Sequence, residues 1–238
     1  MTDNLNDPFA TGDRNHQEMR EQVRAVDTIT LSVLTNLSIT HMAAAAQFAR
    51  AAGEGERAHA GEPFGDFWDE IQANATACIL LSVTALEAYA NELFLNRHEV
   101  FPDMRPAVMD RIWEQYERES IREKYEFALL LRDGDAFDRG APTSQNFDVL
   151  IRLRNALTHF KPEWSDEADE HARLSRALEH RAVRSPFYQA HEPLFPRAWA
   201  SHATARWAVR SALAFVEDFE ERASLPSRFA SSAGRLTT

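Results

Sequence analysis

Hydrophobic residues recur along most of the chain at steps of three and four, the spacing that places them on one face of an α-helix. A first helix is predicted over roughly residues 16–52, where this face is formed by Val23, Val26, Thr30, Val33, Leu34, Leu37, His41, Ala44 and Phe48. Residues 53–65 hold four of the eight glycines together with Pro63. This composition predicts a flexible connection that ends the first helix.

A second helix is predicted from a cap at Asp66 or Asp69 to about Arg97. It carries two neighbouring apolar stripes, of which one is Ile71, Cys78, Ile79, Leu86, Tyr89 and Leu93 and the other is Leu80, Val83, Ala90 and Phe94. A helix that is apolar over most of its circumference must be buried on more than one side. We therefore expect the second stripe to cover another packed element or another subunit, and the chain is predicted to form a homodimer.

The same periodicity and the prolines predict four further helices, over 106–132, from Thr143 or Ser144 to near Lys161, over 166–182 and over 201–223. No internal repeat, heptad run or alternation typical of strands occurs. The predicted fold is all-α, an antiparallel up-and-down helical bundle of four core helices with additional C-terminal helices. The predicted organisation is a disordered tail over 1–15, the bundle over 16–165, further helices of the same domain over 166–223, and a disordered tail over 224–238.

Composition adds limits to this picture. Of the 238 residues, 44% are hydrophobic and 26% are charged, which is typical of soluble globular proteins. The net charge of −11 argues against indiscriminate binding to nucleic acid but allows a local basic site. The single cysteine, Cys78, suits a reducing compartment, and the polar start of the chain does not resemble a signal peptide. The most apolar window, 77–90, is short of the roughly 20 residues of a membrane span, so we expect a cytoplasmic protein without membrane contact.

Candidate chemistry is concentrated at the end of the fourth predicted helix, in Arg154, Asn155 and His159. A guanidinium group matches phosphate oxygens, and an imidazole exchanges protons near neutral pH. Asn155 and His159 are four residues apart and share a helix face, whereas Arg154 lies about 140° away from His159 on an ideal helix. The alternative is that these are ordinary capping and surface residues. The Glu-x-x-His spacing of di-iron bundles occurs only at Glu56–His59, in the glycine-rich connection, so no metal or other cofactor is expected.

The stretch Arg154-Asn155-Ala156-Leu157-Thr158-His159 resembles the R-x(4-6)-H motif of the HEPN superfamily (higher eukaryotes and prokaryotes nucleotide-binding), which has a polar residue after the arginine. Residues 80–94 are similar to the second bundle helix of that family, and the resemblance covers roughly residues 20–165. It implies a dimeric bundle in which two copies of the motif face each other. Many members are metal-independent endoribonucleases, and others are non-catalytic interaction or nucleotide-binding modules.

Under this resemblance His159 acts as general base or acid when the RNA 2′-hydroxyl attacks phosphorus, and the product end is a 2′,3′-cyclic phosphate. Arg154 stabilises the phosphoryl oxygens and Asn155 orients the phosphate. Glu87, a carboxylate within the second apolar stripe, needs a partner and is predicted to orient Arg154 or His159; the alternative is an edge residue or a structural ion pair. The resemblance also implies a role as a toxin or defence element, with an antitoxin or regulatory protein as a partner. DNA, which lacks the 2′-hydroxyl, is expected to stay intact.

Basic residues gather in one later segment of this acidic chain. Residues 171–210 hold seven arginines and two glutamates, interleaved with histidine and aromatic side chains. Such a mixture offers phosphate partners and stacking rings to RNA. The predicted RNA-binding residues are Arg173, Arg176, Arg181 and Arg184, and the alternative is a solvated helix face with aromatic residues in the core.

Overall fold

The computed structural model describes residues 35–164 and 169–238. The chain divides into units Met1–Thr35 and Asn36–Thr238, and every helix of the described residues belongs to the second unit. Within the described residues every regular element is helical, which confirms the all-α prediction. The predicted tail over 1–15 and the predicted start of the first helix lie outside the described residues.

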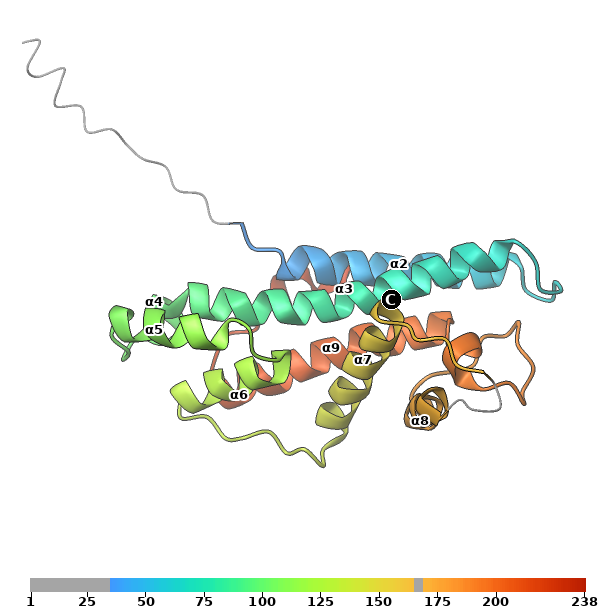
Figure 1. Ribbon diagram of the computed structural model, residues 1–238. Coiled ribbons are helices and arrows are strands. Elements are labelled where there is room, and N and C mark those ends of the chain that lie inside the picture. The colour runs from blue at the N-terminus through green and yellow to red at the C-terminus, as the bar shows by residue number, and fades with distance from the viewer. Residues whose placement is uncertain (1–34, 165–168) are drawn as a thin grey trace, which may run out of the picture. The chain divides into compact units, whose positions relative to one another are not determined.

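Helices follow one another along the whole second unit (Figure 1). Their bounds are α2 Ser38–Ala58, α3 Phe67–Leu95, α4 Arg97–Val100, α5 Pro106–Tyr116, α6 Ile121–Leu131, α7 Pro142–Thr158, α8 Asp169–Leu178, the short kinked helix η1 Leu194–Ala198, α9 His202–Ala223 and the 3-10 helix η2 Ala230–Arg235. The up-and-down antiparallel order of the whole bundle stays a prediction.

Helix α3 is the centre of the fold. It packs along α2 on one side and against α6, α7 and α9 on the other (Figure 1). Both predicted apolar stripes are buried by these helices, the first at positions such as Ile79 and Leu86 and the second at Val83, Ala90 and Phe94. The second stripe is thus covered within the chain and gives no argument for another subunit, and the homodimer stays a prediction.

The apolar character of α3 also bears on membranes. Among the described residues, α3 alone is long and apolar enough to cross a bilayer, and 61% of its most apolar window is buried inside the fold. A mostly buried core helix passes the same test of length and composition, so this single helix is weak evidence for a membrane span.

The connection between α2 and α3 is shorter than predicted, because α2 continues through Gly53 and Gly55 to Ala58. A Cβ atom at Gly53 would lie 2.8 Å from Cγ of His202, and one at Gly55 would lie 2.8 Å from Cγ1 of Ile71. The two glycines therefore allow side chains of α9 and α3 to approach α2 closely. Reading them as a helix stop was wrong.

The predicted helix over 106–132 is two helices, α5 and α6, separated at residues 117–120. Ser120 begins α6 with a capping box: its hydroxyl accepts a hydrogen bond from Glu123 N–H, and the Glu123 carboxylate accepts one from Ser120 N–H at 3.1 Å. The Ser-x-x-Glu spacing is a signal for a helix start that the periodicity had masked.

The later helices match the predicted positions with smaller differences. Helix α7 begins at Pro142, one or two residues before the predicted caps, and ends at Thr158. Helix α8 ends at Leu178 rather than at residue 182, and the predicted positions 166–168 lie outside the described residues. Helix α9 matches the predicted 201–223, and the Ser201 hydroxyl caps it by accepting from Thr204 N–H at 3.1 Å.

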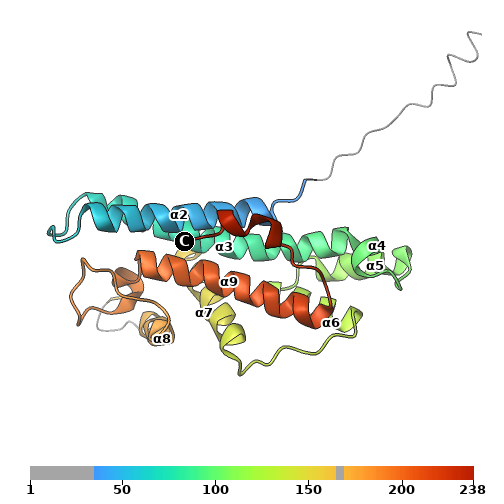
Figure 2. The same cartoon turned by 180° about the vertical axis from the view of Figure 1, so that it is seen from behind.

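The segment 224–238 was predicted to be disordered, and this was wrong. Figure 2 shows the segment lying across α2 with its 3-10 helix η2. Phe229 and Leu236 are buried, and the Arg228 guanidinium binds the Glu92 carboxylate of α3 at 2.6 Å. These few anchors hold a segment whose composition alone does not predict a core contact.

Candidate functional site

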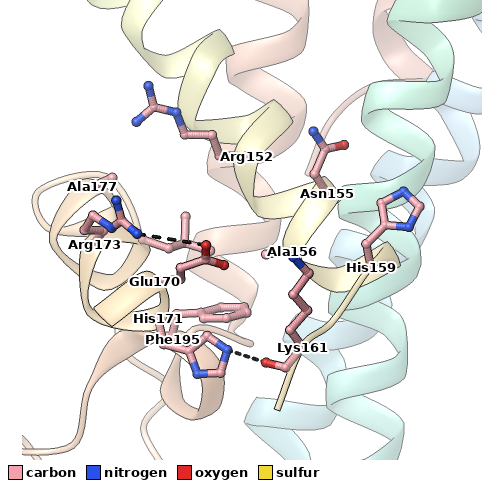
Figure 3. Close-up of a pocket in the computed structure, with 11 residues that line it drawn as sticks. Arg152, Asn155, Ala156, His159, Lys161, Glu170, His171, Arg173, Ala177 and Phe195 are labelled. Carbon is pink, nitrogen blue, oxygen red and sulfur yellow. Dashed lines mark hydrogen bonds and ion pairs between the residues drawn. The ribbon is translucent and has the colours of Figure 1, made fainter. Parts of the chain in front are cut away.

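A cavity of about 590 Å³ opens between α7 and α8 (Figure 3). We call it the α7–α8 cleft. Its polar lining is unusually rich in cationic and imidazole groups for an acidic protein and consists of Arg152, Asn155, His159, Lys161, Glu170, His171 and Arg173. Ala156, Leu174, Ala177 and Phe195 supply its apolar wall.

The α7 side of the cleft is one face of that helix. Arg152, Asn155, Ala156 and His159 are spaced at three, four and seven residues, so they follow each other along consecutive turns. Asn155 and His159 project from the same side of α7 in Figure 3. His159 ends the helix, where its N–H donates to the Asn155 carbonyl at 2.8 Å and its side chain is exposed. The predicted juxtaposition of Asn155 and His159 is therefore present.

Arg154 does not line the cleft. Five residues separate it from His159, which places its side chain about 140° away around α7. It is half-buried, and its Nε has no hydrogen-bond partner among the described residues. The arginine that faces the cleft from α7 is Arg152, which the sequence analysis missed. Its spacing of three from Asn155 and seven from His159 is the signal that would have found it.

The opposite side of the cleft comes from α8 and from the segment after α7. The Arg173 guanidinium lies 4.0 Å from the Glu170 carboxylate, an exposed pair that water screens, and Lys161 lies between the two helices (Figure 3). Three cationic side chains thus line the cleft with one carboxylate. This balance favours an anionic ligand, and two of the three cations are guanidinium groups, whose fork of donors matches phosphate oxygens.

His171 fixes the wall of the cleft beyond His159. Its Nε2 lies 3.0 Å from the Lys161 carbonyl oxygen, and because a carbonyl only accepts, Nε2 carries the proton and donates. Its backbone N–H donates to the Glu163 carboxylate at 3.2 Å, and its ring stacks on Phe160 with centroids 5.3 Å apart. The buried imidazole therefore ties residues 160–163 to α8 and holds the backbone that follows His159.

The predicted role of Glu87 has no support in this arrangement. Glu87 is half-buried on α3, where its charge favours the protonated form of Lys124, although burial of that ammonium has the larger effect and lowers its pKa. No hydrogen bond or ion pair joins Glu87 to Arg154 or His159 in the described part of the chain. The buried carboxylate of α3 is instead Glu92, which binds Arg228.

The four predicted RNA-binding arginines differ in exposure and partners, and their common role stays a prediction. Arg173 lines the cleft, and Arg176 is exposed on α8. Arg181 ties the end of α8 to the start of α7, since its guanidinium donates to Asn146 Oδ1 and Gln145 Oε1, each at 3.0 Å. Arg184 is half-buried. Of the four, only Arg173 belongs to the α7–α8 cleft.

Groups for metal or thiol chemistry do not gather at the cleft. Among the described residues, no cluster of three His, Cys, Asp or Glu side chains is arranged to hold a metal ion. Burial raises the pKa of Cys78 to about 12, and its thiol donates to the Ala205 carbonyl at 3.4 Å. Cys78 is therefore a protonated packing residue between α3 and α9.

The fold and the cleft define an all-helical protein with an electropositive, imidazole-containing site. No family model, no curated protein and no solved structure was found to match the chain. The case for a function therefore rests on the chemistry of the α7–α8 cleft and on the resemblance of residues 154–159 to the HEPN motif.

Proposed function

We propose that this protein is a HEPN-like, metal-independent endoribonuclease that binds RNA in the α7–α8 cleft. The observation that supports the proposal best is that His159 and Asn155, two polar residues of the motif, open into a cavity together with Arg152, Lys161 and Arg173. This combination provides a proton-exchanging group beside donors that match phosphate oxygens.

The proposed reaction uses the RNA 2′-hydroxyl as nucleophile. The His159 imidazole accepts the proton of this hydroxyl while the hydroxyl oxygen attacks the adjacent phosphorus. The bond from phosphorus to the 5′-oxygen breaks, the departing oxygen takes a proton from a water molecule, and the His159 imidazolium returns its proton to the solvent. The products are a 2′,3′-cyclic phosphate and a 5′-hydroxyl. Arg152 and Arg173 bind the non-bridging oxygens as their charge grows, and Asn155 orients the phosphate.

The position of Arg154 changes one part of the family mechanism. Arg154 of the same chain does not reach the cleft that holds His159. In a homodimer with two facing motifs, the second subunit would supply this guanidinium. The proposal therefore includes homodimerisation, a cytoplasmic location, a role as a toxin or defence element, and control by an antitoxin or another regulatory protein, all of which derive from the resemblance.

A second candidate is a non-catalytic helical module that binds RNA or a nucleotide in the same cleft. The observation that favours it is the separation of Arg154 from His159 around α7, because a module needs the cationic lining but no matched catalytic pair. Both candidates require an anionic ligand in the cleft, and they differ in what His159 does to it.

The test is cleavage of varied RNA substrates in the presence of EDTA, with the product 3′ ends identified. We expect 2′,3′-cyclic phosphate ends from the wild type, a loss of roughly 10²- to 10⁴-fold for His159→Ala, and no cleavage of DNA. His191→Ala, which removes an exposed histidine outside the cleft, is the matched control and keeps full activity. A folded His159→Ala variant that cleaves like the wild type would refute the assignment.

Binding separates the two candidates when no cleavage occurs. RNA binding that is lost in an Arg152→Gln/Arg173→Gln variant, without cleavage by any form, supports the module. RNA that neither binds nor is cleaved refutes both candidates, since each needs a phosphate in the α7–α8 cleft.

A further inference from the structure

A second cavity, of about 460 Å³, lies between the first turns of α7 and the N-terminal half of α9. We call it the α7–α9 cavity. Helix α9 contributes Arg206, Trp207 and Arg210, and α7 contributes Thr143 and Asn146. None of the residues that line the α7–α8 cleft takes part in it.

The charge of the α7–α9 cavity is entirely positive. Arg206 and Arg210 are four residues apart and therefore lie on the same face of α9. The lining contains no aspartate or glutamate, and within residues 35–164 and 169–238 neither arginine forms an ion pair with a carboxylate. Two neighbouring guanidinium groups repel each other, so an anion between them would be stabilised by both.

The neutral polar side chains at the cavity are Thr143, Asn146, Trp207 and Ser211. The Nε1 of Trp207 has almost no accessible surface and no hydrogen-bond partner in the described part of the chain, so Trp207 lines the cavity with its ring and not with this donor. The Oδ1 of Asn146 already accepts from Arg181 at 3.0 Å, which leaves the amide NH₂ to donate. The first turn of α7, where Pro142 and Thr143 line the cavity, has no side-chain cap. An acceptor-rich ligand would complement the two guanidinium groups and the Asn146 amide.

We propose that the α7–α9 cavity binds a phosphate-bearing ligand whose oxygens accept from Arg206 and Arg210. A phosphate group supplies negative charge and several acceptors at one point, which is what this set of donors requires. The volume exceeds that of a single phosphate, and Val183, Ala203 and Ala214 offer an apolar wall to the remainder of the ligand. The ligand is a small phosphorylated molecule or a phosphate of an RNA strand. This site does not depend on the proposed nuclease.

Calorimetric titration with inorganic pyrophosphate at low salt tests the site. We expect the wild type to bind and an Arg206→Gln/Arg210→Gln variant to lose at least about tenfold in affinity, because both charged donors are gone. The matched control is Arg111→Gln/Arg118→Gln, which changes the net charge equally at side chains that are 79% and 90% exposed. Its affinity is expected to equal that of the wild type.

Three results would overturn the proposal: no binding by the wild type, equal losses in the test and control variants, or a loss confined to an Arg152→Gln/Arg173→Gln variant of the cleft. Arg206→Gln and Arg210→Gln as single variants each remove one charged donor, so they test the site even if the double arginine variant fails to fold. We expect each single variant to weaken binding by severalfold while circular dichroism stays unchanged, and unchanged affinity in both would count against the site.

Competition identifies the source of the phosphate. A short RNA without terminal phosphates that displaces pyrophosphate from the wild type points to the RNA backbone as the ligand. Pyrophosphate that is displaced only by small phosphomonoesters points to a small phosphorylated molecule. Either result supports the site, and neither depends on whether the α7–α8 cleft cleaves RNA.

Discussion

The carboxylate of Glu92 joins three distant parts of the fold, so its removal is the sharpest test of the packing. Its Oε1 accepts from the backbone N–H groups of Leu37 and Ser38, each at 2.9 Å, and its Oε2 accepts from the Ser38 hydroxyl at 2.7 Å and from Arg228 at 2.6 Å. Helix α2 has no cap from its own first residues. A negative charge from α3 therefore caps α2 and also anchors the C-terminal segment.

The size of the effect follows from the surroundings of each donor. Glu92→Ala leaves the buried N–H and hydroxyl of Ser38 without an acceptor, and an unsatisfied buried group costs about 1–3 kcal/mol. Leu37 is 45% exposed and the Arg228 side chain is 24% exposed, so water partly replaces their bonds. We expect Glu92→Ala to lower the free energy of unfolding by about 3 kcal/mol, at the low end of the range for breaking a buried pair.

Urea unfolding followed by circular dichroism at pH 7 measures this loss as a lower midpoint at unchanged slope. Glu92→Gln keeps an oxygen for the two backbone N–H groups and is expected to lose less, about 1–2 kcal/mol. The control is Glu114→Ala, whose exposed pair with Arg111 is worth at most about 0.5 kcal/mol. A loss below about 1 kcal/mol for Glu92→Ala would show that this network does not hold the fold together.

Two further predictions concern Glu220 of α9 and Gly134, which lies against the end of that helix. Burial raises the pKa of the Glu220 carboxyl, although bonds from Arg228 N–H and Tyr89 partly oppose it. A carboxyl whose pKa is raised on folding stabilises the folded state at low pH, and this stabilisation is lost as the pH rises. The free energy of unfolding of Glu220→Gln minus that of the wild type should therefore increase from pH 4 to pH 7, as urea midpoints at each pH will measure. A decrease of this difference over the same range would contradict the expected sign. For Gly134→Ala, the new Cβ would lie 2.7 Å from the Arg222 carbonyl oxygen. We therefore expect the free energy of unfolding, measured in urea, to fall by about 1–3 kcal/mol. An unchanged midpoint would show that this close approach does not destabilise the fold.

Periodicity predicted best those helices whose ends are marked locally. Helix α9 lies between the Ser201 cap and Ala223 as expected, and α3 ends at Leu95, close to the predicted Arg97. The predicted helix bounds are wrong where contacts between residues far apart in the sequence determine the structure. Gly53 is helical and lies against His202, and the C-terminal segment is held by contacts that include the pair Arg228–Glu92. Neither partner is near in sequence, so no local pattern contains this information.

Helix geometry alone could predict the wall of the α7–α8 cleft that belongs to α7. The four-residue spacing of Asn155 and His159 correctly placed both on one face, and the same rule would have added Arg152 and removed Arg154. The opposite wall was not accessible in this way. The positions of Arg173 and His171 depend on how α8 packs against η1 and α7, and they follow from tertiary contacts rather than from any spacing within one helix.

The separation of Arg154 and His159 around α7 leads to a last prediction. Suppose that RNA cleavage needs Arg154 and His159 at the same phosphate. Because Arg154 does not line the cleft that His159 lines, the two side chains must then come from two different subunits. Arg154→Ala and His159→Ala proteins are each inactive in that case. Their mixed dimer, however, contains one site with an intact Arg154 from one subunit and an intact His159 from the other.

Co-expression of the two variants with different tags tests this arrangement. Random assembly makes about half of the dimers mixed, each with one intact site of two, so activity should return to about a quarter of the wild-type value. A purified mixed dimer without activity would refute the shared site, because then both groups act within one subunit. Activity of the Arg154→Ala homodimer alone would instead assign the phosphate contacts to Arg152 and Arg173, the guanidinium groups that line the α7–α8 cleft.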